Sequence, residues 1–297
     1  MRVENGHGKN KPNIRKFAEN DMADGFNSDG LDCESGGQKK TVKVGTRGSM
    51  LALVQTELVI KALKERFPQI DFQMITMSTR GDRDTSRALL EFGGKAVFVE
   101  EFEEAILKGD IDIAVHSAKD MPMEIMEGLT ISGTLPRACP QDVLIYKSGR
   151  IFDRNESFVV GTSSLRRQYQ IKDMYRNAVC KNLRGNVGTR IQKLEDGEYD
   201  AIILAAAGLE RLGVIEDKGN DSTECFEVHK DELTFRYLST ESMLPAACQG
   251  IIAIETRTSG EAYDMVRAIN DTEVYTQLTC ERAGLSRLIA GCHEPIG

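Results

Sequence analysis

The stretch from Ile111 to Pro122, IDIAVHSAKDMP, joins a buried strand to a polar exit. Its first six residues are a short, mostly apolar run after a Gly-Asp turn, which is typical of a strand covered on both faces. The chain then turns polar, and the proline prevents a regular continuation. In open α/β sheets, ligands bind beyond the carboxyl ends of the strands. The side chains placed there are His116, Ser117, Lys119 and Asp120. The alternative is an ordinary strand exit with a solvated Lys-Asp pair.

Length and composition limit the class of protein. The chain has 297 residues, enough for two or three domains, and a net charge of −8, which argues against nucleic-acid partners. No apolar run is long enough to span a membrane, and no signal-peptide pattern is present. Seven scattered cysteines without a C-x-x-C motif, and four distant histidines, predict reduced thiols, a cytoplasmic location and no metal site.

The hydrophobic pattern predicts alternating strands and helices after a polar, disordered extension at residues 1–40. Strands are expected at residues 41–45, 72–78, 111–116, 130–134, 179–182, 200–205 and 251–255. Ser49 is expected to cap a helix whose buried face carries Leu51, Val54, Leu58, Ala62 and Leu63. Further helices are predicted before Gly109 and at residues 270–289, and residues 215–235 are predicted to be a polar surface insertion.

Two segments of the first half recur in the second. VGTRGSML at residues 44–51 corresponds to VGTSSLRR at 160–167, and KGDIDIAV at 108–115 corresponds to DGEYDAII at 196–203. The repetition predicts two α/β domains of like construction that open onto a shared cleft. In each, a Gly-Thr turn leads into a helix N-terminus that suits an anion. The alternative is that Val-Gly-Thr only makes a tight turn.

Basic side chains recur at the predicted strand exits of this acidic protein, which favours a pocket for a polyanion with several carboxylates. They are Arg47, Lys95, Lys119, Arg166, Arg167, Arg184, Arg190 and Arg211. A single arginine at such a position is more often a solvated surface charge. That alternative is strongest for Arg211, which can pair with Glu210.

These motifs closely resemble the porphobilinogen deaminase (hydroxymethylbilane synthase) family. The matching stretches are VGTR to Arg47, GGK to Lys95, AVHSAKD to Asp120, GTSSLRRQ from Gly161, LRGNVGTR to Arg190, AIILA from Ala201, Gln249-Gly250, Gly291-Cys292 and the final Pro-Ile-Gly. The resemblance implies two type II periplasmic-binding-protein-like α/β domains around a cleft, plus a small α+β third domain, here truncated. The expected boundaries are residues 41–136 with 246–260 for domain 1, 137–245 for domain 2 with a polar insertion at about 217–234, and 261–297 for domain 3.

The resemblance further implies a transferase of tetrapyrrole and haem biosynthesis. It joins four porphobilinogen molecules into a linear tetrapyrrole, with loss of ammonia at each step, on a dipyrromethane primer made from the substrate. Cys292 is then expected to hold the primer by a thioether and Asp120 to be the catalytic carboxylate. Expected primer-binding residues are Lys119, Ser164, Arg166, Arg167, Arg190 and Arg211. Expected substrate-binding residues are Arg47, Ser49, Gln55, Lys95 and Arg184. A monomer is expected, and Cys139, Cys180, Cys248 and Cys280 are expected to be small buried residues.

Three features depart from the family pattern. Glu91 stands where a lysine is usual, residues 217–234 are longer than the usual connection, and the third domain usually continues beyond Pro-Ile-Gly. The last difference leaves an alternative open, a catalytically impaired protein of the same fold that only binds pyrrole carboxylates. A plain periplasmic-type solute receptor is disfavoured by Asp120 and Cys292 in their family context.

Overall fold

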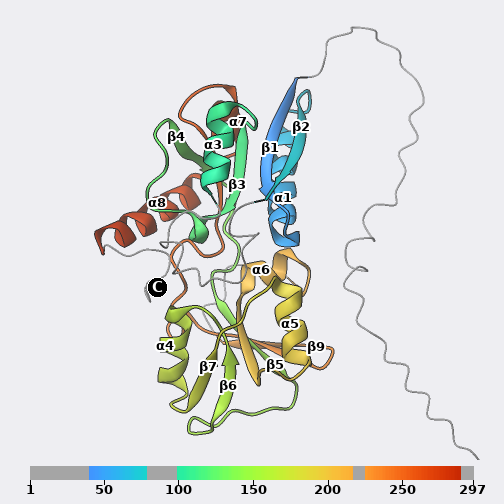
Figure 1. Cartoon of the computed structure of the whole chain (residues 1–297), viewed down its shortest axis with the longest axis vertical. Coiled ribbons are helices and arrows are strands. Elements are labelled where there is room, and N and C mark those ends of the chain that lie inside the picture. The colour runs from blue at the N-terminus through green and yellow to red at the C-terminus, as the bar shows by residue number, and fades with distance from the viewer. Residues whose placement is uncertain (1–39, 79–98, 217–224, 289–297) are drawn as a thin grey trace, which may run out of the picture. The chain divides into compact units, whose positions relative to one another are not determined.

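The computed structural model describes residues 40–78, 99–216 and 225–288. All the described helices and strands lie in one unit, Gln38–Gly297 (Figure 1). The predicted disordered extension lies, apart from residue 40, outside the described residues.

The first sheet has the strand order β2-β1-β3-β11-β4, in which β1 pairs in parallel with β2 and β3, and β11 runs antiparallel to β3 and β4. The strands are β1 Thr41–Arg47, β2 Asp71–Met77, β3 Ile113–Ser117, β4 Leu129–Thr134 and β11 Ile252–Arg257. The helices that belong with this sheet are α1 Met50–Arg66, α3 Glu100–Lys108, the 3-10 helix η3 Ala118–Asp120, α7 Glu261–Ala268 and α8 Thr272–Arg287.

The second sheet has the order β7-β6-β8-β5-β10-β9, with β6 parallel to β7 and β8, and β5 antiparallel to β8 and β10. Its strands are β5 Asp142–Lys147, β6 Phe158–Gly161, β7 Ala178–Lys181, β8 Ala201–Ala205, β9 Phe226–Lys230 and β10 Leu233–Tyr237. Its helices are α4 Leu165–Met174, α5 Val187–Glu195 and α6 Ala206–Arg211.

The two sheets share one construction. The order β2-β1-β3-β11 in the first corresponds to β7-β6-β8-β5 in the second, with an antiparallel fourth strand in each. That fourth strand is exchanged, because β5 follows the elements of the first sheet and β11 follows those of the second. The chain therefore crosses between the sheets twice, at residues 135–141 and 238–251. The predicted pair of like α/β domains is confirmed.

Helices cover both faces of each sheet. On the first sheet, Val59 of α1 and Val266 of α7 belong to one core cluster, whereas Phe102 of α3 and Val274 of α8 belong to two others. On the second sheet, α5 and α4 contribute to separate clusters and lie on opposite sides of the strands (Figure 1). Parallel strands buried on both faces account for the nearly continuous apolar runs of β3 and β8.

Two expectations need correction. Leu58 is 40% exposed, and the buried residues of α1 are Gln55, Thr56, Val59, Ile60 and Leu63, so the buried face is rotated from the predicted one. Residues 226–237, most of which fall in the predicted insertion, instead form the β9–β10 hairpin at the edge of the second sheet, while residues 217–224 lie outside the described residues. The helices α7 and α8 contact the first sheet. The third domain and the exact domain boundaries stay predictions.

Candidate active site

The exit of β3 has the geometry that the sequence predicts. Ser117 ends the strand, and η3 carries Lys119 and Asp120. Two backbone hydrogen bonds hold this turn, one from the Ala118 N–H to Ile251 O at 3.0 Å and one from the Met121 N–H to Ala118 O at 3.2 Å. The turn is thus anchored to the second crossing segment, and Asp120 stays exposed.

A cavity of about 100 Å³ lies at this exit. It is lined by Arg47, Ser49, Leu51, Ala52, Gln55, Val99, Val115, His116, Ser117 and Asp120. Four predicted site residues therefore meet there, because the exits of the adjacent parallel strands β1 and β3 lie at the same edge of the sheet. They are Arg47, Ser49, Gln55 and Asp120.

The N-terminus of α1 forms one wall of this cavity. Ser49 is the N-cap, and its Oγ accepts a hydrogen bond from the Ala52 N–H at 3.3 Å. One turn later Gln55 is buried and exchanges hydrogen bonds with the Ser117 hydroxyl at 3.0 and 3.2 Å. The wall combines a positive helix end with an arginine, which suits a carboxylate.

His116 and Glu255 form a buried pair next to the cavity that the sequence analysis did not assign. Nε2 of His116 lies 3.1 Å from Oε2 of Glu255, and Phe102 packs edge-on against the imidazole. Burial raises the pKa of the nearby Glu103 carboxyl group. A hydrogen bond that this carboxylate accepts from the Met126 N–H lowers its pKa in part. The sequence signal was a histidine and a glutamate within otherwise apolar strands.

The N-terminus of α4 carries the next predicted residues. Ser164 caps this helix, its Oγ accepting from the Arg167 N–H at 3.5 Å. Arg166 and Arg167 are buried, and both pair with Asp142, at 2.7 and 2.6 Å respectively. These two ion pairs hold the pKa of Asp142 at about 2, against the effect of its burial.

Lys119 lies close to these arginines although it belongs to the other sheet. Burial lowers the pKa of its ammonium, Arg167 and Arg166 lower it further, and Asp120 and Asp142 raise it. Its Nζ donates to Oε1 of Gln249 at 3.4 Å. The β3 exit and the start of α4 therefore form one electrostatic cluster across the two sheets.

Arg190 belongs to the same cluster from a third element, α5. Its Nε donates to Gly185 O at 2.7 Å. Burial lowers the pKa of Arg190, as does Arg167, whereas Asp120 raises it. Among the described residues, four cations thus lie near the carboxylates of Asp120 and Asp142. This cation cluster consists of Lys119, Arg166, Arg167 and Arg190.

The remaining predicted residues are placed differently. Arg211 ends α6, where its Nη2 donates to Gly250 O at 2.6 Å in the second crossing segment. Arg184 lies in the loop between β7 and α5. Among the described residues, neither lines the cavity at the β3 exit. Lys95, Cys292 and Glu91 lie outside the described residues.

The cation cluster fits a group with several carboxylates. Nε of Arg167 is buried and has no hydrogen-bond partner among the described residues. Among the described residues, the four cations of the cluster also outnumber Asp120 and Asp142, which favours an anionic ligand. The dipyrromethane that the family resemblance implies carries acetate and propionate groups, so the residues present fit it.

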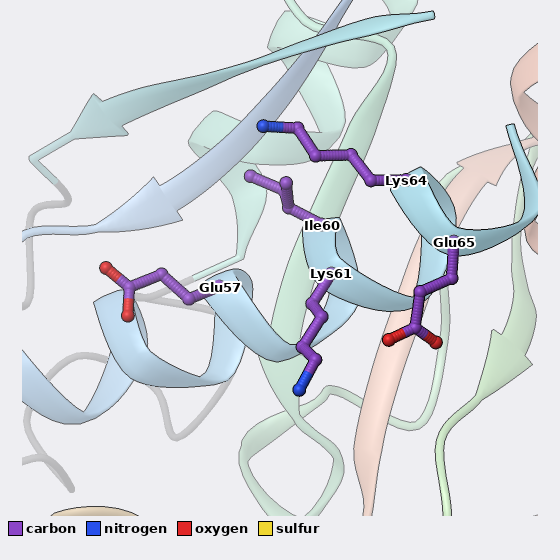
Figure 2. A pocket seen from close by; sticks show the side chains of 5 residues that line it. All are labelled: Glu57, Ile60, Lys61, Lys64 and Glu65. Carbon is purple, nitrogen blue, oxygen red and sulfur yellow. The ribbon is translucent and has the colours of Figure 1, made fainter. Parts of the chain in front are cut away.

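Other features of the described residues carry no such chemistry. No cluster of metal-ligating side chains occurs among them. A wide, open hollow of about 460 Å³ lies on α1 and is lined by Glu57, Ile60, Lys61, Lys64 and Glu65 (Figure 2). All five come from one helix, and the charged side chains point in different directions (Figure 2). No helix in the described part of the chain is both long and apolar enough to cross a membrane.

The cysteines only partly follow expectation. Cys139 and Cys248 are buried, as predicted, and Cys180 is half-buried. Cys280 is exposed, contrary to prediction, because it lies on the side of α8 that faces away from the buried Val274 and Leu278.

Comparison with known proteins now identifies the family. The family model described as "Porphobilinogen deaminase, dipyromethane cofactor binding domain" matches residues 42–264. The chain belongs to the porphobilinogen deaminase family. The matched range includes the cavity residues, Asp142 and the cation cluster.

Curated relatives of this family match most of the chain. The porphobilinogen deaminase of Streptococcus sanguinis is 40% identical over 260 residues, covering 86% of this chain and 81% of the relative. That of Bacillus subtilis is 42% identical over 261 residues, covering 86% and 78%. Among solved structures, the Bordetella pertussis BvgS periplasmic VFT2 domain has a TM-score of 0.43 and 14% identity, covering 81% of this chain and 92% of that one.

Proposed function

We propose that this protein joins four porphobilinogen molecules head to tail into hydroxymethylbilane, releasing one ammonia for each. The observation that carries the proposal is the position of Asp120. In a chain of this family, its carboxylate lies at a strand exit, in a cavity and beside a cluster of cations that come from both sheets.

Asp120 is the catalytic carboxylate in this proposal. Loss of ammonia from the aminomethyl group of porphobilinogen leaves a cationic carbon conjugated with the pyrrole ring. A fixed carboxylate that accepts the pyrrole N–H stabilises this cation electrostatically. The same carboxylate is suited to move the protons that free ammonia and restore the aromatic ring.

The wall of the cavity binds the substrate's side chains. Arg47 and the N-terminus of α1 at Ser49 receive a carboxylate, and the Gln55–Ser117 pair orients polar groups beside Asp120. Lys95 and Arg184 are assigned to substrate binding from their family motifs. Charged hydrogen bonds of this kind contribute roughly 1.5–3 kcal/mol each.

The cation cluster binds the primer. A dipyrromethane on Cys292, when bound, supplies the pyrrole carbon to which the first substrate unit is joined. Lys119, Ser164, Arg166, Arg167, Arg190 and Arg211 are the residues assigned to hold its carboxylates. They would hold its carboxylates in place, and the buried Nε of Arg167 is one available donor.

We also propose that the protein acts as a cytoplasmic monomer without nucleic-acid partners. The net charge of −8 supports the absence of a nucleic-acid interaction. The seven scattered cysteines without a C-x-x-C motif agree with a reducing compartment. Size-exclusion chromatography with light scattering, and cell fractionation, test these assignments.

A turnover assay tests the proposed function. The purified chain is incubated with porphobilinogen, and substrate loss, ammonia release and the cyclised tetrapyrrole are quantified. Equal amounts of ammonia and consumed substrate, with one tetrapyrrole per four substrates, are expected. Binding of porphobilinogen without ammonia release would contradict the proposal and leave the carboxylate-binding alternative.

A further inference from the structure

Asp142 is a fully buried carboxylate at the centre of the contacts around the cation cluster. It begins β5, directly after the first crossing segment. Its Oδ2 accepts from Nη2 of Arg166 at 2.7 Å, and its Oδ1 accepts from Nη2 of Arg167 at 2.6 Å. One carboxylate thus fixes two of the four cations.

The arginines are held by a second bond each. Nη1 of Arg166 donates to Leu244 O in the second crossing segment, and Nη1 of Arg167 donates to Ile203 O of β8 at 2.9 Å. Two bonds on different nitrogens leave a planar guanidinium little freedom to rotate. For Arg167 this leaves the buried Nε without a partner among the described residues. The donor is available for a bound carboxylate.

Gln249 extends the contacts of Asp142 to the other sheet. Its Nε2 donates to Oδ1 of Asp142 at 2.9 Å and to Pro140 O at 2.6 Å, and its Oε1 accepts from Lys119 at 3.4 Å. Asp142 adjoins the first crossing segment and Gln249 belongs to the second. A chain of direct contacts therefore runs from Lys119 at the β3 exit to the two arginines on α4.

We propose that Asp142 is the positioning residue of the primer site, holding Arg166 and Arg167 in the orientation that receives the primer and coupling them to Lys119 through Gln249. This inference rests on the proposed function. Asp142 acts through the arginines and Gln249 and touches no reacting atom.

The charges around Lys119 give the proposal a measurable consequence. The groups that face its ammonium are Asp120 of η3, Asp142 of β5, and Arg166 and Arg167 of α4. Because Asp142 raises the pKa of Lys119, removal of its charge lowers that pKa further. Lys119 then loses its proton at a lower pH, and carboxylate binding at Lys119 is lost on the alkaline side.

The alternative is that Asp142 only stabilises the fold. Removing one partner from a buried ion pair is destabilising in any protein. A purely structural role would lower stability but leave the primer-loaded fraction of the folded variant unchanged. The two roles are therefore separable.

The test compares Asp142→Asn with Asp200→Asn in the full chain. Asp200 is a matched control in the same half, because it also pairs with an arginine, Arg150 at 3.3 Å, and accepts from a backbone N–H, that of Val159 at 2.7 Å. Two quantities are measured, the primer-loaded fraction of the purified chain by intact mass, and porphobilinogen turnover against pH. Circular dichroism confirms that each variant is folded.

Asp142→Asn is expected to reduce the loaded fraction severalfold and to move the alkaline limb of the rate profile to lower pH. Asp200→Asn is expected to change neither. Both effects are needed, so an unchanged loaded fraction or an unmoved limb overturns the proposal. If Asp142→Asn does not fold, Gln249→Met takes its place, since it keeps both ion pairs but breaks the contact chain to Lys119. A severalfold lower loaded fraction is then required, and an unchanged one overturns the proposal.

The wild-type chain separates failure of this inference from failure of the proposed function. A wild-type chain with neither primer nor turnover contradicts the function, and the inference falls with it. A wild-type chain that is loaded and active, with Asp142→Asn indistinguishable from it, contradicts the role of Asp142 alone.

Discussion

Nε2 of His116 lies 3.1 Å from Oε2 of Glu255, and this contact joins β3 to β11 beside the cavity at the β3 exit. The two side chains are 6% and 0% exposed, and the other carboxylate oxygen of Glu255 has no hydrogen-bond partner among the described residues. The buried carboxylate of Glu255 therefore depends on the imidazole of His116 as its hydrogen-bond partner.

His116→Ala is expected to destabilise the protein by removing that partner. Leaving a buried acceptor unsatisfied costs about 1–3 kcal/mol in the free energy of unfolding, and loss of the ring's packing against Phe102 adds to this. Urea unfolding at neutral pH measures the change. His229→Ala is the control, since His229 is 65% exposed and lies 3.9 Å from Glu227. Equal effects of the two variants would contradict the importance of the buried pair.

Asp120→Ala is expected to abolish turnover without unfolding the protein. Asp120 is exposed at the cavity, so its removal leaves no void in the core, while the substrate cation loses its electrostatic stabiliser. Losses of about 10²–10³-fold in kcat follow removal of one such group. Initial rates with porphobilinogen measure the effect, and the exposed Asp110→Ala serves as a control from the same half. Near-normal turnover in Asp120→Ala would refute the mechanism.

Asp142 is expected to contribute to stability in a defined pH range. Its folded pKa of about 2 lies below its ordinary value of 3.8, so the contribution is present above about pH 4 and is lost as the pH falls toward 2. A depression of this size corresponds to about 2 kcal/mol. Urea unfolding between pH 5 and pH 2 should therefore show a shallower acid decline in Asp142→Asn than in the wild type. Parallel declines would contradict the assigned pKa.

Gly250 is expected to tolerate no side chain. Its φ is +87°, and an added Cβ would overlap the carbonyl oxygen of Ala138 where the two crossing segments meet. Gly149 is a matched control, with a φ of +81° and nothing within 4 Å of an added Cβ. Both alanine variants carry the backbone strain, so Gly250→Ala should cost about 1–3 kcal/mol more in thermal or urea unfolding, the usual range for overpacking. Equal losses would show that the crossing segments yield to the added methyl group.

The strand exits and helix caps could be predicted from sequence because their signals are local. The apolar run at β3 and the cap Ser49 appear in the structure where they were expected, and both Gly-Thr pairs lie at a strand end that leads into a helix. The strand expected at residues 251–255 is β11, which returns to the first sheet. The strand and the helix cap depend on residues that are neighbours in sequence, so the pattern of residue types along the chain predicts them.

Features set by distant contacts could not be predicted in the same way. The β9–β10 hairpin was hidden because β9, an edge strand carrying Glu227 and His229, is largely polar. The rotated buried face of α1 depends on its position over β1 and β3. Nothing local marks Asp142, and the Gln249-Gly250 motif does not reveal the contacts of Gln249; the partners of both residues lie 24 to 130 positions away in sequence.

The most direct measurement is the intact mass of the purified chain before and after addition of porphobilinogen. We expect a mass equal to the polypeptide plus one dipyrromethane, and we expect this added mass to be absent in Cys292→Ser. Addition of substrate is expected to increase the mass in steps of one pyrrole unit. A bare polypeptide mass under both conditions would contradict the proposed function, because the cation cluster would then hold no primer and the chain would build no tetrapyrrole.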